Sequence, residues 1–443
     1  MKTRFLLLQI VIVWLLIGCQ QPAGSVQITQ TPPVILTSTV SRPSPTASFT
    51  PVATLTPTPT ATVTPQPSAT PRFPPEARME FQCLEVLPTP TESVESKGVV
   101  ILDSWVMVDG HYTGDAFLLD MATMKSVLLS GDSRGAIYFT VSPDRKLMAY
   151  YNTTLNTLDI ATADGEVLEA IPWEEGWTGI PGWLDNEWLV INISGLDPLE
   201  NAHRKPAHLL ALNPFTGERK ILAPDFPDIH TFDMFDWADW SRTMYAPSLT
   251  RVVYLTEYDN FSFVLWDLDN GQELTRLPAV FPMWRYIPIP RWTPDGARFV
   301  VEAWIPAEER LELFQVSRDG EIEQLTNLYP FGKVTLTGLT WSPDGRYLAG
   351  WLDTSLGEDP ALELIVLDTH TQQITNYCLQ VRYFGEGFSG TPKEPIWAPD
   401  GTQLIVTDWY AQDHRRVILV DLVQGFAAQI AADMEPVGWM LAP

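Results

Sequence analysis

One segment of the sequence concentrates side chains suited to binding a ligand. Residues 225–240 contain five Asp and five aromatic residues. Carboxylates attract cations and accept hydrogen bonds, while aromatic faces stack on cations and on flat apolar surfaces. Aromatic residues in shorter stretches complete the candidates. We predict binding through Phe232, Asp233, Phe235, Asp236, Trp237, Asp239, Trp240, Trp284, Tyr286, Phe331 and Phe388. Packing of these aromatic side chains against neighbouring elements is the alternative.

Three patterns that could indicate an enzyme or a metal site are incomplete. A nucleophile elbow around Ser389 would need a glycine where Thr391 stands, and too few residues follow it for a hydrolase domain. The stretch 267–271 begins like a calcium loop but lacks the bidentate Glu at loop position 12, which favours a strand-connecting turn. The six His show no metal-ligand spacing. We therefore predict no catalytic residue, no metal site and no cofactor.

The elements that carry these residues follow from a repeat. An aromatic residue, then Ser, Thr or Ala, then Pro-Asp-Gly recurs along the chain, with weaker copies between. The equivalent first positions are Val141, Trp183, Tyr245, Trp292, Trp341, Trp397 and Trp439. Pro presets φ and Asp-Gly supplies positive φ, so each copy predicts a tight turn between strands. The copies lie 42 to 62 residues apart, and most of these spacings are typical of the blades of a β-propeller.

These motifs, over residues 98–443, resemble the Trp-Ser-Pro-Asp-Gly repeats of TolB-type, WD-like β-propellers. The resemblance implies an all-β fold of four-stranded blades. It leaves the function open, because propellers of this kind serve as scaffolds, sensors and enzyme accessory domains. A binding module is therefore the first hypothesis. A lyase or hydrolase that uses carboxylates in the central channel is the alternative.

The two ends of the repeat region predict how the ring closes. Residues 435–440 predict an inner strand, after which the chain stops. Residues 99–103, 115–120 and 125–129 predict three strands with no inner strand before them. Together they complete one blade and leave no long open edge. We predict seven blades, with six or eight as the alternatives.

The ligand candidates share one predicted position in the blades. They fall in the loops that link each outer strand to the next inner strand, and these loops lie on one face of a propeller. Residues 225–240 account for most of the longest spacing between repeats. We predict that they form one wall of the binding site.

The N terminus predicts export and a tether. Lys2 and Arg4 precede an apolar stretch that is too short for a membrane span, which is typical of a signal peptide over residues 1–18. Leu16-Ile17-Gly18-Cys19 resembles a bacterial lipobox, which implies that Cys19 becomes the lipid-modified N terminus. An uncleaved signal anchor is the alternative. Residues 19–75, rich in Thr, Pro, Ser and Ala, predict a disordered, semi-stiff linker. The propeller domain is predicted over 76–443.

Two further cysteines remain once Cys19 is assigned to lipid. In an exported domain, Cys83 and Cys378 predict a disulfide, with two free thiols as the alternative. The bond would join residues before the first strand to the loop after the outer strand of the fifth blade.

The charge of the protein limits its partners. The chain has a net charge of −26, and residues 76–443 hold 24 Lys and Arg against 54 Asp and Glu. Such a charge excludes nucleic acid and an anionic membrane surface as partners. We predict a monomer on the extracytoplasmic side of a bacterial membrane, held by lipid on Cys19. Its predicted partner is a protein, a peptide or a glycan of the cell envelope.

Overall fold

The computed structural model divides the chain into two units, Met1–Pro67 and Ser68–Pro443, and describes residues of the second unit only. The described residues are 79–87, 96–104, 106–108, 111–113, 115–129, 135–193, 208–222, 245–255, 262–279, 289–305, 310–328, 334–353, 361–382, 393–411 and 414–442. Their regular elements are all β-strands. Among them there is no helix with the length and apolar character needed to cross a membrane.

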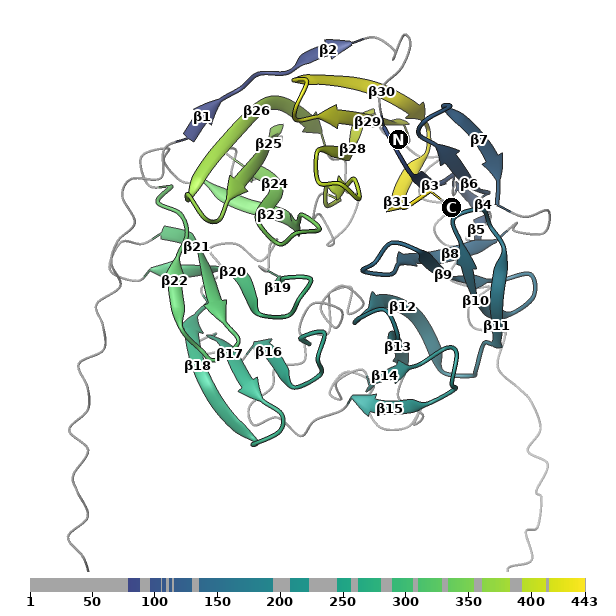
Figure 1. The fold of residues 1–443 in the computed structure, drawn as a ribbon, viewed down its shortest axis with the longest axis horizontal. Coiled ribbons are helices and arrows are strands. Elements are labelled where there is room, and N and C mark those ends of the chain that lie inside the picture. The colour runs from purple at the N-terminus through teal and green to yellow at the C-terminus, as the bar shows by residue number, and fades with distance from the viewer. Residues whose placement is uncertain are drawn as a thin grey trace, which may run out of the picture. The chain divides into compact units, whose positions relative to one another are not determined.

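The strands form seven small sheets around a central axis, so the unit is a seven-bladed β-propeller (Figure 1). The predicted fold class and the predicted number of blades are confirmed. We number the blades from the first complete one along the chain. Within a blade, the strands follow the chain from the centre to the rim, and neighbours are antiparallel.

The first four blades are consecutive in the chain. Blade 1 contains β8 (Ala136–Val141), β9 (Leu147–Asn152), β10 (Thr157–Thr162) and β11 (Val167–Pro172). Blade 2 contains β12 (Trp177–Trp183), β13 (Leu189–Ile193), β14 (His208–Leu212) and β15 (Arg219–Leu222). Blade 3 contains β16 (Arg251–Leu255), β17 (Ser262–Asp267) and β18 (Gln272–Pro278), with Tyr245 bridged to Val252 at the inner position. Blade 4 contains β19 (Arg291–Trp292), β20 (Arg298–Ile305), β21 (Arg310–Ser317) and β22 (Ile322–Gln324).

The next two blades complete the consecutive part. Blade 5 contains β23 (Thr335–Trp341), β24 (Tyr347–Asp353), β25 (Ala361–Asp368) and β26 (Gln373–Arg382). Blade 6 contains β27 (Ile396–Trp397), β28 (Gln403–Ala411), β29 (His414–Asp421) and β30 (Phe426–Ala432). The middle of β24 is buried at five successive positions, because a blade has a neighbour on both faces. Such strands therefore read as continuous apolar runs in the sequence.

Blade 7 closes the ring with both ends of the repeat region. It contains β31 (Glu435–Met440), β3 (Val99–Asp103), β6 (Ala116–Asp120) and β7 (Lys125–Leu128). A small pair, β4 (Val106–Val108) and β5 (His111–Thr113), lies between β3 and β6 in the chain. β31 is antiparallel to β3, with Asp103 opposite Glu435 and Val99 opposite Met440. The predicted closure is confirmed, and Figure 1 shows the yellow β31 beside the dark blue β3.

A strap that the sequence did not predict runs along the rim of blades 5 and 6. β1 (Met79–Phe81) pairs in parallel with β26, and β2 (Glu85–Leu87) pairs in parallel with β30. Between them, Cys83 forms a disulfide with Cys378, whose sulfur lies 1.91 Å away. Cys378 lies within β26, so the expected position in the loop after that strand is wrong. β26 continues through a bulge to Arg382 and so extends beyond Cys378.

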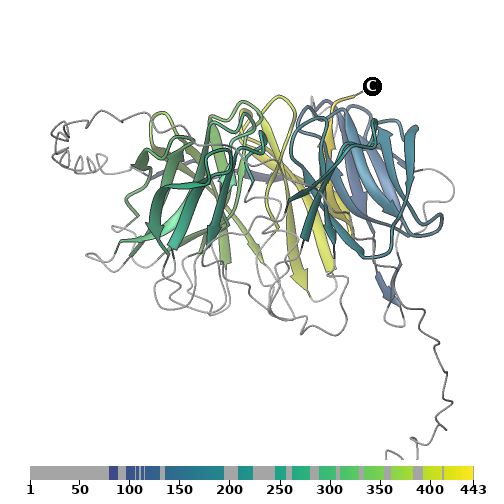
Figure 2. The same ribbon diagram turned by 90° about the horizontal axis from the view of Figure 1, so that it is seen from below.

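The two faces of the ring differ. Tight hairpin turns gather on one face, where the chain also ends (Figure 2). We call this the turn face, and it carries the repeat motifs, such as residues 342–345 between β23 and β24. We call the face at the other ends of the strands the loop face. The loop face is where described strands end or begin on either side of residues 223–244, 280–288, 329–333 and 383–392.

Candidate functional site

The aromatic residue of the repeat ends an inner strand and bonds to the preceding blade. Trp341 Nε1 donates a hydrogen bond to the carbonyl of Arg291 at 3.0 Å, and Trp397 Nε1 donates to that of Thr340 at 3.1 Å. In both cases the acceptor lies one residue before the aromatic residue of the preceding blade. The aromatic residue of the repeat therefore packs between two blades. Trp183 is equally buried, but within the described part of the chain its Nε1 has no hydrogen-bond partner.

The turn after each inner strand is fixed by its own side chains. Ser342 Oγ donates to Asp344 Oδ1 and accepts from the backbone N–H of Tyr347 at 2.8 Å. Gly345 follows with φ 67°, a left-handed conformation that glycine adopts without steric cost. Blade 1 departs from this pattern because Arg145 occupies the glycine position, with φ 61°. The motif thus brings a cationic side chain to the centre of the turn face.

A cavity of about 380 Å³ lies at the centre of the ring, at the turn-face ends of the inner strands. Six of its lining residues are aromatic and four are prolines of the turns, among polar, charged and aliphatic residues. The rings belong to Phe139, Trp183, Tyr245, Trp292, Trp341 and Trp439. Its charged side chains are Arg145, Arg291 and Glu394. The lining is therefore more basic than acidic, in a protein whose net charge is −26.

Arg291 and Glu394 form an ion pair within this lining. Arg291 belongs to blade 4, and Glu394 lies just before β27 of blade 6. The intervening blade 5 also takes part, since Arg291 Nε donates to the carbonyl of Leu339 at 3.1 Å. The charges of this pair compensate each other, and the contacts join three successive blades around the cavity.

Arg145 is held differently, by backbone carbonyls alone. Its Nη1 donates to the carbonyl of Trp397 in blade 6 and, at 3.3 Å, to that of Trp439 in blade 7. Burial lowers the pKa of Arg145 to about 10, so the guanidinium remains charged at neutral pH. Within the described residues no carboxylate pairs with it. Among the residues that the structure describes, this cation at the cavity thus has carbonyl partners but no carboxylate partner.

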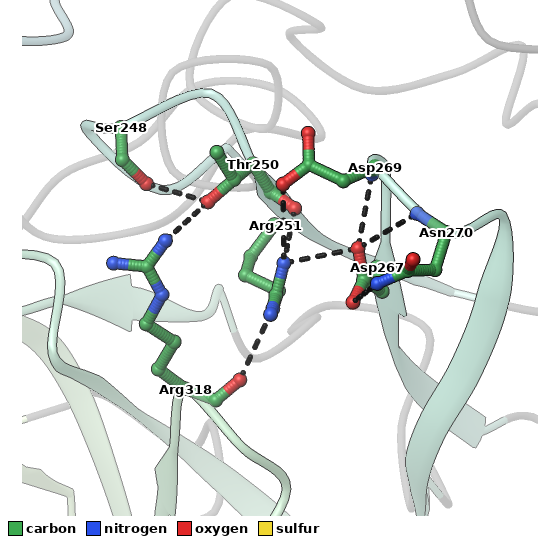
Figure 3. Close-up of polar contacts among 7 residues, drawn as sticks. All are labelled: Ser248, Thr250, Arg251, Asp267, Asp269, Asn270 and Arg318. Atoms are coloured by element: carbon green, nitrogen blue, oxygen red, sulfur yellow. Dashed lines mark hydrogen bonds and ion pairs between the residues drawn. The ribbon is translucent and has the colours of Figure 1, made fainter.

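Residues 267–271 form a turn between two strands, as the sequence predicted in preference to a calcium loop (Figure 3). Asp267 Oδ1 accepts from the backbone N–H groups of Asp269 and Asn270 at 2.9 and 3.1 Å, which fixes the turn between β17 and β18. Its carboxylate also pairs with Arg251 at 3.0 Å. Arg251 Nε in turn donates to the carbonyl of Arg318 in blade 4 at 3.3 Å. These contacts tie blade 3 to blade 4 on the turn face, and among the described residues there is no group of three or more potential metal ligands.

Two buried carboxyl groups lie in blade 4, close to blade 5. Glu312 accepts hydrogen bonds from Thr326 Oγ1 at 2.7 Å and from the backbone N–H of Leu328 at 2.8 Å. Glu302 accepts from the backbone N–H of Leu336 in blade 5. The pKa of Glu302 is raised to about 8: burial is the largest cause, the Leu336 hydrogen bond opposes it, and the charges of Glu312 and Asp353 add to the rise. Glu302 is therefore largely protonated at neutral pH.

The predicted binding residues in 225–240, together with Trp284, Tyr286, Phe331 and Phe388, lie outside the described residues. The same is true of Cys19 and of the stretch around Ser389. The link between β11 and β12 is described, and there Trp173 packs on Tyr151 with ring centroids 4.1 Å apart.

Sequence reasoning did not identify Arg145. The signal was present, because the first copy of the repeat has Arg where the three complete copies have Gly. In the sequence alone, that difference only weakens the turn motif. The structure shows that it places a charged group beside the central cavity.

Comparisons with known proteins find likenesses among solved structures. No family model matches the sequence, and no curated protein matches it. TolB of Acinetobacter baumannii is 14% identical over 77% of this chain and 82% of its own, with a TM-score of 0.39. Oligogalacturonate lyase of Vibrio parahaemolyticus is 14% identical over 80% of this chain and 97% of its own, with a TM-score of 0.46. Hydrazine synthase of Kuenenia stuttgartiensis is 12% identical over 66% of this chain and 78% of its own, with a TM-score of 0.38. These likenesses concern the fold alone.

Proposed function

We propose that the protein is an exported, lipid-anchored propeller that binds a protein, peptide or glycan of the bacterial cell envelope. The observation that carries the binding part is the position of the strands around residues 223–244. β15 ends at Leu222 on the rim of blade 2, and Tyr245 stands at the inner position of blade 3. An acidic and aromatic segment is thus bracketed by the rim of one blade and the centre of the next. A closed ring gives such a segment a rigid support.

The disulfide supports export. Cys83–Cys378 closes a loop of 295 residues along the chain, and bonds of this kind persist in oxidising compartments. The lipobox-like sequence at Cys19 supplies the proposed anchor, and residues 20–75 the proposed spacer. Cys19→Ser should abolish incorporation of labelled palmitate and the cleavage that accompanies it. Unlabelled wild-type protein with the same processing as the variant would refute the anchor.

The binding proposal is tested with full-length protein as bait for envelope extract after chemical crosslinking. Asp233, Asp236 and Asp239 are replaced together by Asn, which removes three charges from the proposed site. The matched control replaces three exposed Asp on turn-face hairpins, Asp164, Asp269 and Asp319, by Asn. We expect the first variant to lose its partner and the control to keep it. Identical partner profiles for both variants would refute the proposed site.

Catalysis by carboxylates in the central channel is the second hypothesis. Among the described carboxyl groups, Glu302 has the raised pKa that a general acid needs. Glu302 is only 2% exposed, however, so substrate cannot reach its carboxyl group without separation of blades 4 and 5. The burial of Glu302 thus favours a structural role for this residue, which the pH dependence of stability tests. Binding therefore remains the first hypothesis.

A further inference from the structure

The central cavity holds a cation, Arg145, that no carboxylate of the described residues pairs with. Arg145 reaches the cavity from the turn of blade 1 and is partly buried. A buried charge is unfavourable unless a partner replaces its lost hydration. Two carbonyl groups supply dipoles to Nη1, but within the described residues no carboxylate supplies a counter-charge. An anion in the cavity would compensate this charge.

The two nitrogen atoms of Arg145 without a described contact indicate which kind of anion would bind. No described contact involves Arg145 Nε or Nη2, and neither atom is closed off from solvent. These two N–H groups lie on the same edge of the planar guanidinium and point in the same direction. This fork matches the two oxygens of one carboxylate, which can accept both hydrogen bonds at once.

The other lining residues indicate which kind of group the carboxylate is attached to. Trp183, Trp292 and Trp341 are among the lining residues, and of these Trp292 is half-buried while the other two are buried. The Arg291–Glu394 pair supplies no net charge. Aromatic walls favour a flat ring with an apolar face. A volume of about 380 Å³ lies within the range of small-molecule sites.

We propose that the turn-face cavity is a binding site for a small organic monocarboxylate, held by the free edge of Arg145, with its ring against the tryptophans. This site is separate from the one proposed on the loop face. Either proposal can therefore fail without the other.

Titration of the full-length protein in detergent tests the site through tryptophan fluorescence and the melting temperature. Benzoate, glucuronate and N-acetylphenylalanine present the same carboxylate on an aromatic ring, a sugar ring and a peptide unit. Benzamide is the neutral counterpart of benzoate, and acetate lacks a ring. We expect saturable binding of at least one ring-bearing carboxylate, with a raised melting temperature. The compound that binds most tightly then shows whether the ligand carries its carboxylate on an aromatic ring, a sugar ring or a peptide unit.

Two variants of Arg145 assign the binding to its guanidinium. R145G installs the residue that the other turns have, and R145Q removes the charge while keeping an N–H donor for the carbonyl of Trp397. Both should weaken binding by about tenfold or more, because a hydrogen bond to a charged group is lost. K146A removes a charge from the same turn, but Lys146 is exposed and pairs with Asp144, so binding should not change.

Three results would overturn the proposal. They are failure of all three ring-bearing carboxylates to bind, equal binding of benzamide and benzoate, and unchanged affinity in a folded R145G or R145Q protein. A melting curve without ligand establishes that each variant is folded. If R145G does not fold, R145Q decides the outcome alone.

Discussion

At the scale of single residues, Glu302 links the charge of the protein to its stability. In the folded protein its pKa is about 8, whereas the ordinary value is 4.5. Between these two values an unfolded chain releases the proton and the folded protein keeps it. The free energy of unfolding therefore falls by about 1.4 kcal/mol per pH unit over this range. The stability contributed by the neutral carboxyl is complete below pH 4.5 and is lost as the pH rises through 8.

Glu302→Gln should remove this dependence. Gln is neutral at every pH and can still accept from the backbone N–H of Leu336. We expect the variant to gain stability over the wild type as the pH rises from 5 to 8, as measured by chemical denaturation at each pH. Glu321→Gln, at an exposed position of the same blade, should leave the profile unchanged. Parallel profiles for wild type and Glu302→Gln would contradict the assignment.

Comparison of Trp341 with Trp183 distinguishes the contribution of the indole N–H to stability from that of the ring. Trp341 and Trp183 are 7% and 8% exposed, and both end inner strands. Trp341 Nε1 donates to the carbonyl of Arg291, whereas Trp183 Nε1 has no partner among the described residues. Trp341→Phe should therefore cost about 1 to 2 kcal/mol more of unfolding free energy than Trp183→Phe, because a buried carbonyl loses its donor. Equal losses in denaturant unfolding would show that the rings alone matter.

At the scale of elements, the repeat made the inner part of each blade predictable. The turn between the first two strands needs Pro, Asp and Gly at fixed positions, so sequence and geometry correspond there. The pairing of β31 with β3 was predictable for a different reason, since an inner strand without followers and outer strands without an inner strand complete each other. The strap was not predictable, because residues 79–87 lie outside the repeat and pair in parallel with strands 295 and 341 positions later. The ligand candidates belong to segments without repeat or period, which gives sequence reasoning no register.

The disulfide should hold the strap to blades 5 and 6. β1 and β2 have three residues each, and Phe81 and Val86 are about two-thirds exposed, so their own pairing contributes little. In the Cys19→Ser protein, denatured without reductant, thiol titration should find no free thiol. Replacing Cys83 and Cys378 by Ser should lower the free energy of unfolding by about 2 to 4 kcal/mol. Reductant should not affect that variant further, and two free thiols in the parent would contradict the bond.

At the scale of the whole molecule, stability depends on the contact between the last blade and the first. Blade 7 is held together by strands from opposite ends of the repeat region, and its inner strand also packs against blade 1. Met440 of β31 belongs to a buried cluster there, and the partly buried Val141 of β8 packs against it. Opening this contact would expose the edge of β3 and one face of blade 1. The ring should therefore unfold as one cooperative unit when the closing strand is disturbed.

A single methyl group tests this closure more sharply than a deletion. A Cβ on Gly438 of β31 would lie 2.3 Å from Val141 Cγ2, so Gly438→Ala forces blades 7 and 1 apart. A Cβ on Gly179, in the inner strand of blade 2, would lie no closer than 3.8 Å to another atom, so Gly179→Ala is a matched control. We expect Gly438→Ala to lower the free energy of unfolding by about 1 to 3 kcal/mol in one transition, and Gly179→Ala to leave it nearly unchanged. Removal of residues 435–443 should have a larger effect, with aggregation through the exposed edge of β3. If Gly438→Ala melted like the control, close packing of blade 7 on blade 1 would not hold the ring, and the disulfide-linked strap over blades 5 and 6 would be the stronger candidate.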